Sequence, residues 1–212
     1  MIAVINSGSA NLGSVLHALV KVGSEAVITD DPMVINSAAG IVFPGVGAFE
    51  HAARLLREKK LDTVLADVIA AGKPFLGICL GLQLLFGFSE ERSSKDLPFP
   101  KGINAVPGRV KRFAPGLTVP HVGWNRVFSR KEHPLLEGLN EGSYFYFNHS
   151  YYVEPEEREV VLTETEYGEV FVSSIARGNL MGVQFHPEKS GSSGLRLLKN
   201  FAIIAGSAAP LE

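Results

Sequence analysis

Short apolar runs alternate with amphipathic stretches along the first half of the chain. Runs whose length suits a buried strand occur at residues 2–5, 26–29, 40–43 and 75–78. Between them, apolar side chains recur every three or four positions, which predicts helices over residues 14–22, 49–60, 62–71 and 80–88. Asp62 suits the N-cap of the third helix, and Gly72 suits its end. Strands that alternate with helices favour a mostly parallel sheet with helices on both faces.

The pattern changes after Ser89. Residues 89–101 are polar and contain Pro98 and Pro100, which predicts a loop. Strand-like segments follow at residues 108–113, 124–128, 143–153, 159–164, 169–177 and 180–185, and an amphipathic helix is predicted over 193–205. The chain has no internal repeat and no linker-like stretch. We therefore expect residues 1–212 to form a single α/β domain, with a central, mostly parallel sheet flanked by helices and an additional antiparallel β region.

Composition excludes several classes of function. The 212 residues include 20 Lys and Arg against 22 Asp and Glu, so no basic excess suggests a nucleic-acid partner. Glycines interrupt the longest apolar run, and the N-terminus lacks a basic region, so neither a membrane span nor a signal peptide is expected. These features predict a cytoplasmic protein. The single cysteine, Cys79, rules out an internal disulfide, and no histidine pair has zinc-ligand spacing, so we expect no metal and no cofactor.

Cys79 lies where the fourth predicted strand meets the helix that follows it. Glycines flank it two positions away on either side, in Gly77-Ile78-Cys79-Leu80-Gly81, the cysteine form of the nucleophile elbow. Such a turn strains its central residue and places the sulfur at a helix N-terminus, where the thiolate is favoured. Most free cysteines are small core residues instead. The flanking glycines favour the functional interpretation here.

His186 is the histidine best placed to act as a base. It follows the predicted strand at 180–185 and precedes Pro187, which ends that strand. His186 and Glu188 are two apart in extended chain, so they can point the same way and the carboxylate can orient the imidazole. Alone, the tripeptide His186-Pro187-Glu188 is weak evidence for a catalytic site. Together with Cys79 it predicts a Cys-His-Glu catalytic triad.

A second glycine-containing turn follows the third predicted strand. Gly45-Val46-Gly47 can present successive backbone N–H groups, and with the N–H of Leu80 it can complete an oxyanion hole. A phosphate site is disfavoured, because this turn lacks a third glycine and the earlier glycine-rich turn lacks a lysine before Ser14.

Aromatic residues are dense between residues 144 and 152, where alternation along a strand makes most of them core residues. At the strand end, His149, Ser150 and Tyr151 can supply polar contacts to a small substrate.

Taken together, the motifs of residues 77–83, 44–47 and 184–188 resemble those of class I (triad) glutamine amidotransferases. More narrowly, the segments HVGWN at 121–125, YFNHSY at 146–151 and PEKS at 187–190 resemble the glutaminase subunits of imidazole glycerol phosphate synthases. The matches run in order from residue 6 to residue 190, which is more specific than any single motif. The resemblance implies a flavodoxin-like fold typical of class I amidotransferases.

The resemblance also implies roles for the matching residues. Cys79 would attack the side-chain amide of glutamine, His186 would serve as base and then as acid to the leaving ammonia, and Glu188 would orient His186. The thioester would then be hydrolysed to glutamate. The backbone at Val46, Gly47 and Leu80, after a peptide flip, would stabilise the oxyanion. The implied substrate-binding residues are Gly45, Gln83, His149, Ser150 and Tyr151.

A partner is implied as well. In this family the ammonia passes to a cyclase subunit, a (β/α)8 barrel, within a heterodimer. That subunit forms imidazole glycerol phosphate and an aminoimidazole carboxamide ribotide in histidine biosynthesis. The implied interface positions are Asn11, Trp124 and Lys189, although Trp124 also suits the core. The chain departs from the family pattern at residues 6–11 and at Asn148.

Three alternatives stay open at this stage. Glutaminase subunits for guanylate, anthranilate or carbamoyl phosphate synthesis share the elbow and the His-Pro-Glu motif. Cysteine peptidases and deglycases share the fold, but in them a histidine typically follows the nucleophile, where this chain has Leu80. A non-catalytic binding module would be expected to lose the thiol, the base or the acid, and all three are present.

Overall fold

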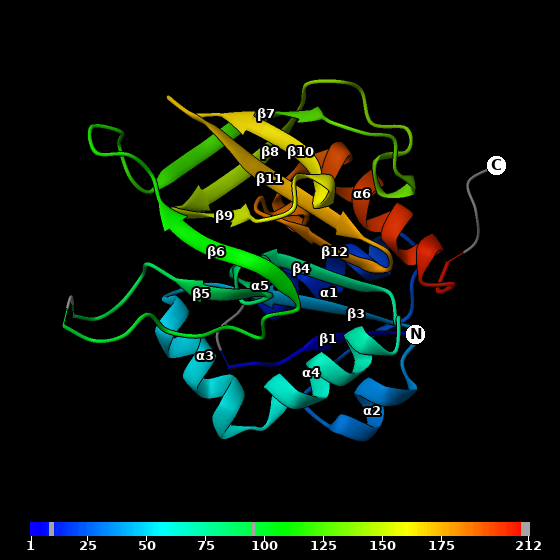
Figure 1. Cartoon of the computed structure of the whole chain (residues 1–212). Helices are drawn as coiled ribbons and strands as arrows, with labels where there is room; N and C mark the ends of the chain where they lie inside the picture. Colours follow the sequence, from blue (N-terminus) through cyan, green and yellow to red (C-terminus); the bar gives the residue numbers. More distant parts are fainter. Residues whose placement is uncertain (9–10, 95, 209–212) are drawn as a thin grey trace.

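The computed structural model describes residues 1–8, 11–94 and 96–208, which form a mixed sheet with helices on its faces (Figure 1). At one end of the sheet five strands run parallel, in the spatial order β2-β1-β3-β4-β12. Four of them are buried along their whole length, which matches their continuous apolar sequences. The strands are β2 (Ala26–Thr29), β1 (Ile2–Ile5), β3 (Gly40–Gly45), β4 (Phe75–Cys79) and β12 (Leu180–Val183).

Beyond β12 the sheet continues as antiparallel strands in the order β11-β10-β7-β8. A side arm of β5, β6 and β9 joins this region where β9 pairs with β11. These strands are β5 (Phe86–Ser89), β6 (Val106–Arg112), β7 (His121–Ser129), β8 (Ser143–His149), β9 (Tyr151–Pro155), β10 (Val161–Glu166) and β11 (Val170–Arg177).

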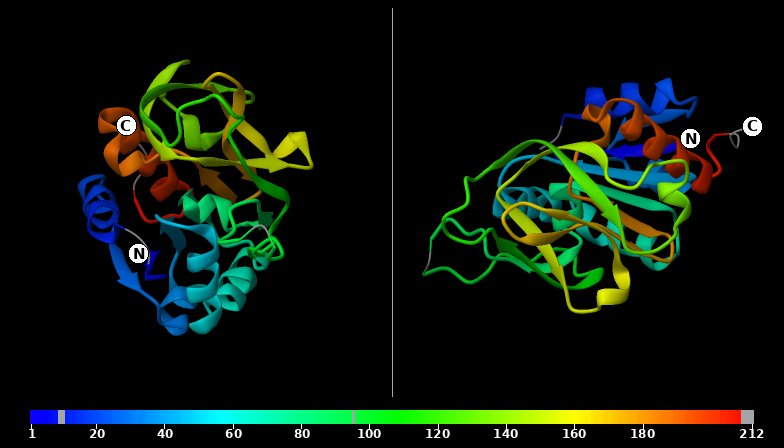
Figure 2. Two further views of the ribbon diagram at one scale, coloured as in Figure 1. Left: turned by 90° about the vertical axis from the view of Figure 1, so that its left-hand side faces the viewer. Right: turned by 90° about the horizontal axis from the view of Figure 1, so that it is seen from above.

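The helices cover both faces of the parallel strands. One apolar cluster lies between the sheet and α2, α3 and α4, and a second lies between the opposite face and α1 and α6. Figures 1 and 2 show the antiparallel strands at the end of the molecule opposite α3 and α4. The helices are α1 (Leu12–Lys21), α2 (Pro32–Ser37), α3 (Phe49–Glu58), α4 (Leu61–Ala70), α5 (Leu80–Gln83) and α6 (Gly191–Ile204), with 3-10 turns η1 (Pro134–Leu136), η2 (Arg158–Val160) and η3 (Pro187–Lys189).

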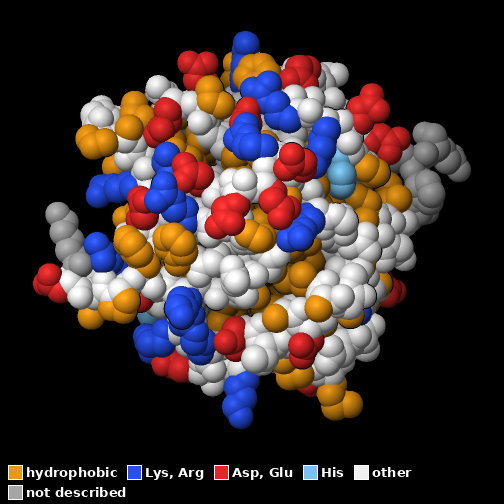
Figure 3. Space-filling view, in the orientation of Figure 1, with side chains coloured by type: hydrophobic (Ala, Val, Ile, Leu, Met, Phe, Trp, Pro, Cys, Tyr) orange, Lys and Arg blue, Asp and Glu red, His pale blue; other side chains and the backbone are white. Residues whose placement is uncertain are grey.

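On the molecular surface, acidic and basic side chains are interspersed on the face that Figure 3 shows. Glu154 illustrates the mixing, because it pairs with Arg109 at 2.7 Å and with Lys111 at 3.1 Å. Among the described helices, none combines the length and apolar character that crossing a bilayer requires.

The predicted fold class is confirmed, and most predicted elements lie within a few residues of their observed bounds. Three local predictions are wrong. The helix over 80–88 ends at Gln83, because Phe86–Ser89 form β5 and pair with β6. The strand over 143–153 is two strands, β8 and β9, which meet at Ser150. Asp62 does not cap α4, which begins one residue earlier, after Lys60 in left-handed conformation.

Sequence periodicity also missed α2, which is too short to show a helical repeat. Its start is encoded locally: the Asp31 side chain accepts a hydrogen bond from the Met33 N–H, and Pro32 occupies the first helical position.

The turn from β4 into α5 is the feature of the fold that places Cys79, the predicted nucleophile. Cys79 lies in the turn with φ 55° and ψ −111°, outside the conformations that a non-glycine residue ordinarily adopts. Such strain costs about 1–3 kcal/mol, so the surroundings must impose it. The two glycines do so by close packing: a Cβ on Gly77 would lie 2.9 Å from the Gly81 carbonyl, and one on Gly81 would lie 1.8 Å from the Phe43 carbonyl oxygen.

Replacing Gly81 with alanine should therefore lower the free energy of unfolding by roughly 3 kcal/mol or more, because β3 and the turn must move apart. Gly13→Ala is the matched control: Gly13 lies in α1 and an added Cβ there would meet nothing within 4 Å. That change should be neutral or stabilising by up to about 1 kcal/mol. Urea denaturation of both variants measures the difference, and equal stabilities would contradict the tight packing of the turn.

Candidate active site

The three predicted triad residues meet at the carboxyl edge of the parallel strands. Cys79 ends β4, and His186 follows β12, which lies beside β4 with Val183 opposite Ile78. Because neighbouring parallel strands end at the same edge of a sheet, residues far apart in sequence come together there. Glu188 lies in η3, and its Oε1 is 2.9 Å from Nδ1 of His186.

The electrostatics of His186 favour its protonated form. Burial alone would lower the pKa of His186, but hydrogen bonds to Cys79 and Glu188, and the charges of these partners, raise it to about 10. Glu188 engages Nδ1, so Nε2 is the nitrogen left to face the sulfur. At neutral pH the ring is therefore protonated, and its positive charge lies beside the sulfur.

A cavity of about 230 Å³ opens at the sulfur. This volume is smaller than the roughly 300–1,000 Å³ of pockets for drug-sized ligands, so it suits a single small amino acid. Its lining includes nine of the residues singled out from the sequence. They are Val46, Gly47, Cys79, Leu80, Gln83, His149, Ser150, Tyr151 and His186.

Gln83 is buried in the lining of this cavity, and its hydrogen bonds fix the orientation of its amide. Its Nε2 donates to the Tyr151 carbonyl at 2.9 Å and to Oε1 of Gln184 at 3.0 Å. Both N–H hydrogens are then engaged, which leaves Oε1 of Gln83 as the group it can offer to a ligand.

His149 lines the cavity but offers no free ring nitrogen. Its Nδ1 donates to the Tyr151 carbonyl at 2.9 Å, and its Nε2 lies 3.1 Å from Nδ1 of His121. Burial lowers the pKa of His149 to about 3 and that of His121 to about 4, so both rings are neutral at pH 7. The structure therefore places His149 as a support for Tyr151.

The glycine turn after β3 forms one wall of the site. Gly45 pairs with Cys79 in the β3–β4 ladder and does not line the cavity. A glycine at position 45 allows β3 and Leu80 to pack closely, since a Cβ there would lie 2.9 Å from Cβ of Leu80. Val46 is 41% exposed, and Gly47 has φ +98°, a conformation that glycine adopts readily.

Sequence reasoning did not identify every residue of the site. Glu91 lines the cavity from the loop after β5, where burial raises the pKa of its carboxyl although the Phe49 N–H donates to it at 2.9 Å. Pro120 and Asn148 complete the lining, and the Asn148 carbonyl lies 3.9 Å from the sulfur. A glutamate in a polar loop carries no sequence signal of its own, and it reaches the site only through the fold.

The predicted interface residues are all exposed. Trp124 points outward from β7 with 55% of its surface accessible, so the interpretation of Trp124 as a core residue is wrong. The Tyr146 ring lies between Trp124, at 6.3 Å, and Nζ of Lys189, at 5.8 Å. Asn11 precedes α1 without a side-chain capping bond. The departure from the family pattern at residues 6–11 falls partly on residues 9 and 10, which lie outside the described residues.

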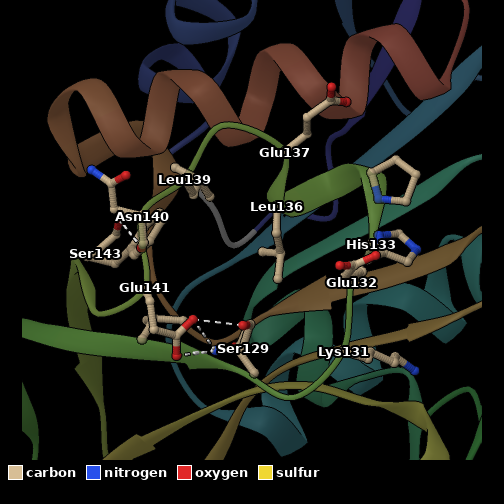
Figure 4. A pocket seen from close by; sticks show the side chains of 14 residues that line it. Ser129, Lys131, Glu132, His133, Leu136, Glu137, Leu139, Asn140, Glu141 and Ser143 are labelled. Atoms are coloured by element: carbon tan, nitrogen blue, oxygen red, sulfur yellow. Dashed lines mark hydrogen bonds between the residues drawn. The ribbon is translucent and has the colours of Figure 1, made fainter.

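A larger cavity, of about 510 Å³, lies apart from this chemistry, between η1 and strands β7, β8 and β10 (Figure 4). The carboxylate of Glu141, which lines this cavity, accepts hydrogen bonds from the backbone N–H and the hydroxyl of Ser129. The residues that line this cavity include no triad member.

Comparison with known families agrees with this geometry. Residues 3–205 match the family described as glutamine amidotransferase class-I, and the chain belongs to that family. A solved glutamine amidotransferase shares the fold with a TM-score of 0.74 at 19% identity, covering 97% of this chain and 98% of the other. PurLQS from Thermotoga maritima superimposes with a TM-score of 0.71 at 18% identity, covering 96% and 97% of the two chains.

Within the family, the chain groups with the subunits called HisH of imidazole glycerol phosphate synthase. The HisH subunit of Moorella thermoacetica is 50% identical over 200 residues, which cover 94% of this chain and 93% of the relative. That of Thermococcus kodakarensis is 50% identical over 206 residues, covering 95% and 98% of the two chains. That of Aquifex aeolicus is 49% identical over 199 residues, covering 93% and 94%.

Proposed function

We propose that this chain is the glutaminase subunit of an imidazole glycerol phosphate synthase and releases ammonia from glutamine for histidine biosynthesis. The observation that carries the proposal is the line Cys79–His186–Glu188 at the opening of a cavity sized for an amino acid. The full-length similarity to HisH subunits supports the particular synthase.

The geometry suits acyl transfer in two steps. The Cys79 thiolate attacks the side-chain carbonyl carbon of glutamine, and the resulting tetrahedral oxyanion collapses as imidazolium His186 gives its proton to the leaving amine. Ammonia leaves and a thioester remains. Neutral His186 then takes a proton from water, which attacks the thioester, so glutamate departs and the thiolate–imidazolium pair is restored. Glu188 holds Nδ1 of His186 throughout.

For substrate binding, the two acceptors in the cavity suit the α-ammonium group of glutamine. We assign these contacts to the Glu91 carboxylate and Oε1 of Gln83. Burial disfavours the charged form of the Glu91 carboxylate, and a bound cation would stabilise that form. Ser150 and Tyr151 also line the cavity, and we assign to them the contacts with the rest of the amino-acid end.

For the oxyanion, we propose the backbone N–H groups of Val46 and Leu80 as donors. Both residues line the cavity beside the sulfur. The positive φ of Gly47 supports a turn whose peptide can reorient at low cost, so the hole can form when substrate or partner is bound.

The relatives are subunits of a synthase, which implies a partner subunit. We propose a cyclase subunit with a (β/α)8 barrel, bound to the outward face of the β7–β8 hairpin as a heterodimer. Val122 and Trp124 are 56% and 55% exposed there, and Tyr144 is 49% exposed. Asn148 lies on the same face and also lines the active-site cavity, so a partner on this face would meet the ammonia as it leaves. Asn11 and Lys189 remain proposed contacts, and a cytoplasmic location remains a prediction.

The alternatives have less support. The likeness to the solved glutamine amidotransferase and to PurLQS is at 19% and 18% identity and concerns the fold alone. A peptidase would need space for a polypeptide, and a cavity of about 230 Å³ does not provide it.

The triad assignment predicts the outcome of single substitutions. Cys79→Ala should abolish glutamine hydrolysis with little loss of stability, because the change removes only the sulfur. Glu188→Ala should reduce turnover less than His186→Ala, since Glu188 acts through His186. Glutamate release measured with and without the cyclase subunit, alongside thermal unfolding, tests both. Substantial turnover by the Cys79 variant would overturn the mechanism.

The partner assignment makes a separate prediction. Trp124→Ala should weaken binding of the cyclase subunit by about tenfold or more, because an exposed aromatic residue at an interface centre is a typical hot spot. Met33→Ala is the control, since Met33 is 80% exposed on α2, on the opposite face of the sheet from α1 and α6. Isothermal titration compares the two, and equal affinities would place the interface elsewhere.

A further inference from the structure

The side chain of Gln184 is a contact of the nucleophile that the triad mechanism does not use. Gln184 follows β12 and is fully buried, with its backbone N–H bound to the Ser173 carbonyl at 2.8 Å. Its Nε2 lies 3.6 Å from Sγ of Cys79, within hydrogen-bonding reach of a sulfur acceptor. We propose that Gln184 is a further catalytic residue, which donates an N–H to the thiolate of Cys79.

The neighbouring hydrogen bonds fix which end of the Gln184 amide faces the sulfur. The Tyr151 carbonyl can only accept, so the group of Gln83 bound to it must be its NH₂. The second hydrogen of that NH₂ goes to Gln184, which must therefore present its oxygen to Gln83. Only the Gln184 nitrogen is left to face Sγ, and a reversed amide would place two donors against each other.

His149 strengthens this orientation from the opposite side. Its Nδ1 donates to the same Tyr151 carbonyl that receives Gln83. The neutral His149 ring thus helps to hold that carbonyl in place, and the carbonyl orients Gln83, which in turn orients Gln184. The donor to the sulfur is preorganised before any substrate arrives.

Short α5 makes such a donor useful. With only four residues, α5 supplies far less of a helix dipole than the helix predicted over residues 80–88 would. The titratable groups around the sulfur are His186 and Glu188 after β12, His149 on β8, Tyr151 on β9 and Glu91 after β5. Gln184 carries no charge, so its effect on the sulfur is that of a fixed hydrogen-bond donor.

The test uses the full chain and the rate of alkylation of Cys79 by iodoacetamide as a function of pH. Cys79 is the single cysteine of the sequence, so alkylation reports on it alone. Gln184→Met keeps the length of the side chain and removes the donor. We expect the pH of half-maximal alkylation rate to rise by about one unit, which is a tenfold loss of thiolate at a fixed lower pH.

Asn200→Leu is the matched control. Asn200 is a buried amide on α6 whose Nδ2 donates to the Leu135 and Glu137 carbonyls, away from the sulfur. This variant should lose stability yet keep the wild-type pH profile. An unshifted profile for the Gln184 variant, or an equal shift for the Asn200 variant, would overturn the inference. Should Gln184→Met not fold, Gln184→Asn replaces it, because the shorter side chain withdraws the amide from the sulfur. A shifted pH profile for that variant supports the inference, and an unshifted profile overturns it.

The inference rests on the proposed function, since a stabilised thiolate matters for glutamine cleavage. The role of Gln184 and the proposed glutaminase function can be disproved independently, because alkylation of Cys79 requires no glutamine. A shifted profile in a chain that cannot hydrolyse glutamine would overturn the function alone. An active chain with an unshifted profile would overturn the role of Gln184 alone.

Discussion

The strained backbone of Cys79, with its positive φ of 55°, is the constraint on which the rest of the site depends. It is held by close packing at the β4–α5 turn, where the Gly81 backbone meets the Phe43 carbonyl with no room for a side chain. The tight turn presents the sulfur at the carboxyl edge of the sheet. Relaxation of this turn would move the sulfur away from His186, so the stability of the fold and the proposed chemistry are coupled here.

Sheet order then determines which groups reach the sulfur. Strand β12 lies beside β4 and delivers His186, and β3 lies on the other side and delivers the Gly45–Gly47 turn. The start of β9 adds Tyr151, which orients Gln83. The outward face of β7 and β8 includes Asn148, which also lines the cavity, so a protein that binds there would contact the proposed site of ammonia release.

Local sequence patterns were sufficient to predict the parallel core and the strand-to-helix turn at Cys79, because glycine spacing and strand ends act over a few residues. They also selected Cys79, His186 and Glu188, which the fold brings together and whose catalytic roles stay a proposal. They failed where distant pairing decides the outcome. Phe86–Ser89 continues a helical pattern but forms a strand because β6 lies beside it. Glu91 and Gln184 reach the site only through neighbours that the fold brings near, and both ring nitrogens of His149 are engaged within the protein.

The pairing of the Cys79 sulfur with the His186 imidazole is most directly tested by an NMR titration of His186. Its raised pKa, about 10, means that the ring should stay protonated through neutral pH and lose its proton only in the alkaline range. In Cys79→Ala the sulfur partner is gone while burial still opposes the charge, so the titration should move to lower pH. Identical titrations in the two proteins, or wild-type titration near the ordinary value of 6.5, would contradict the pairing.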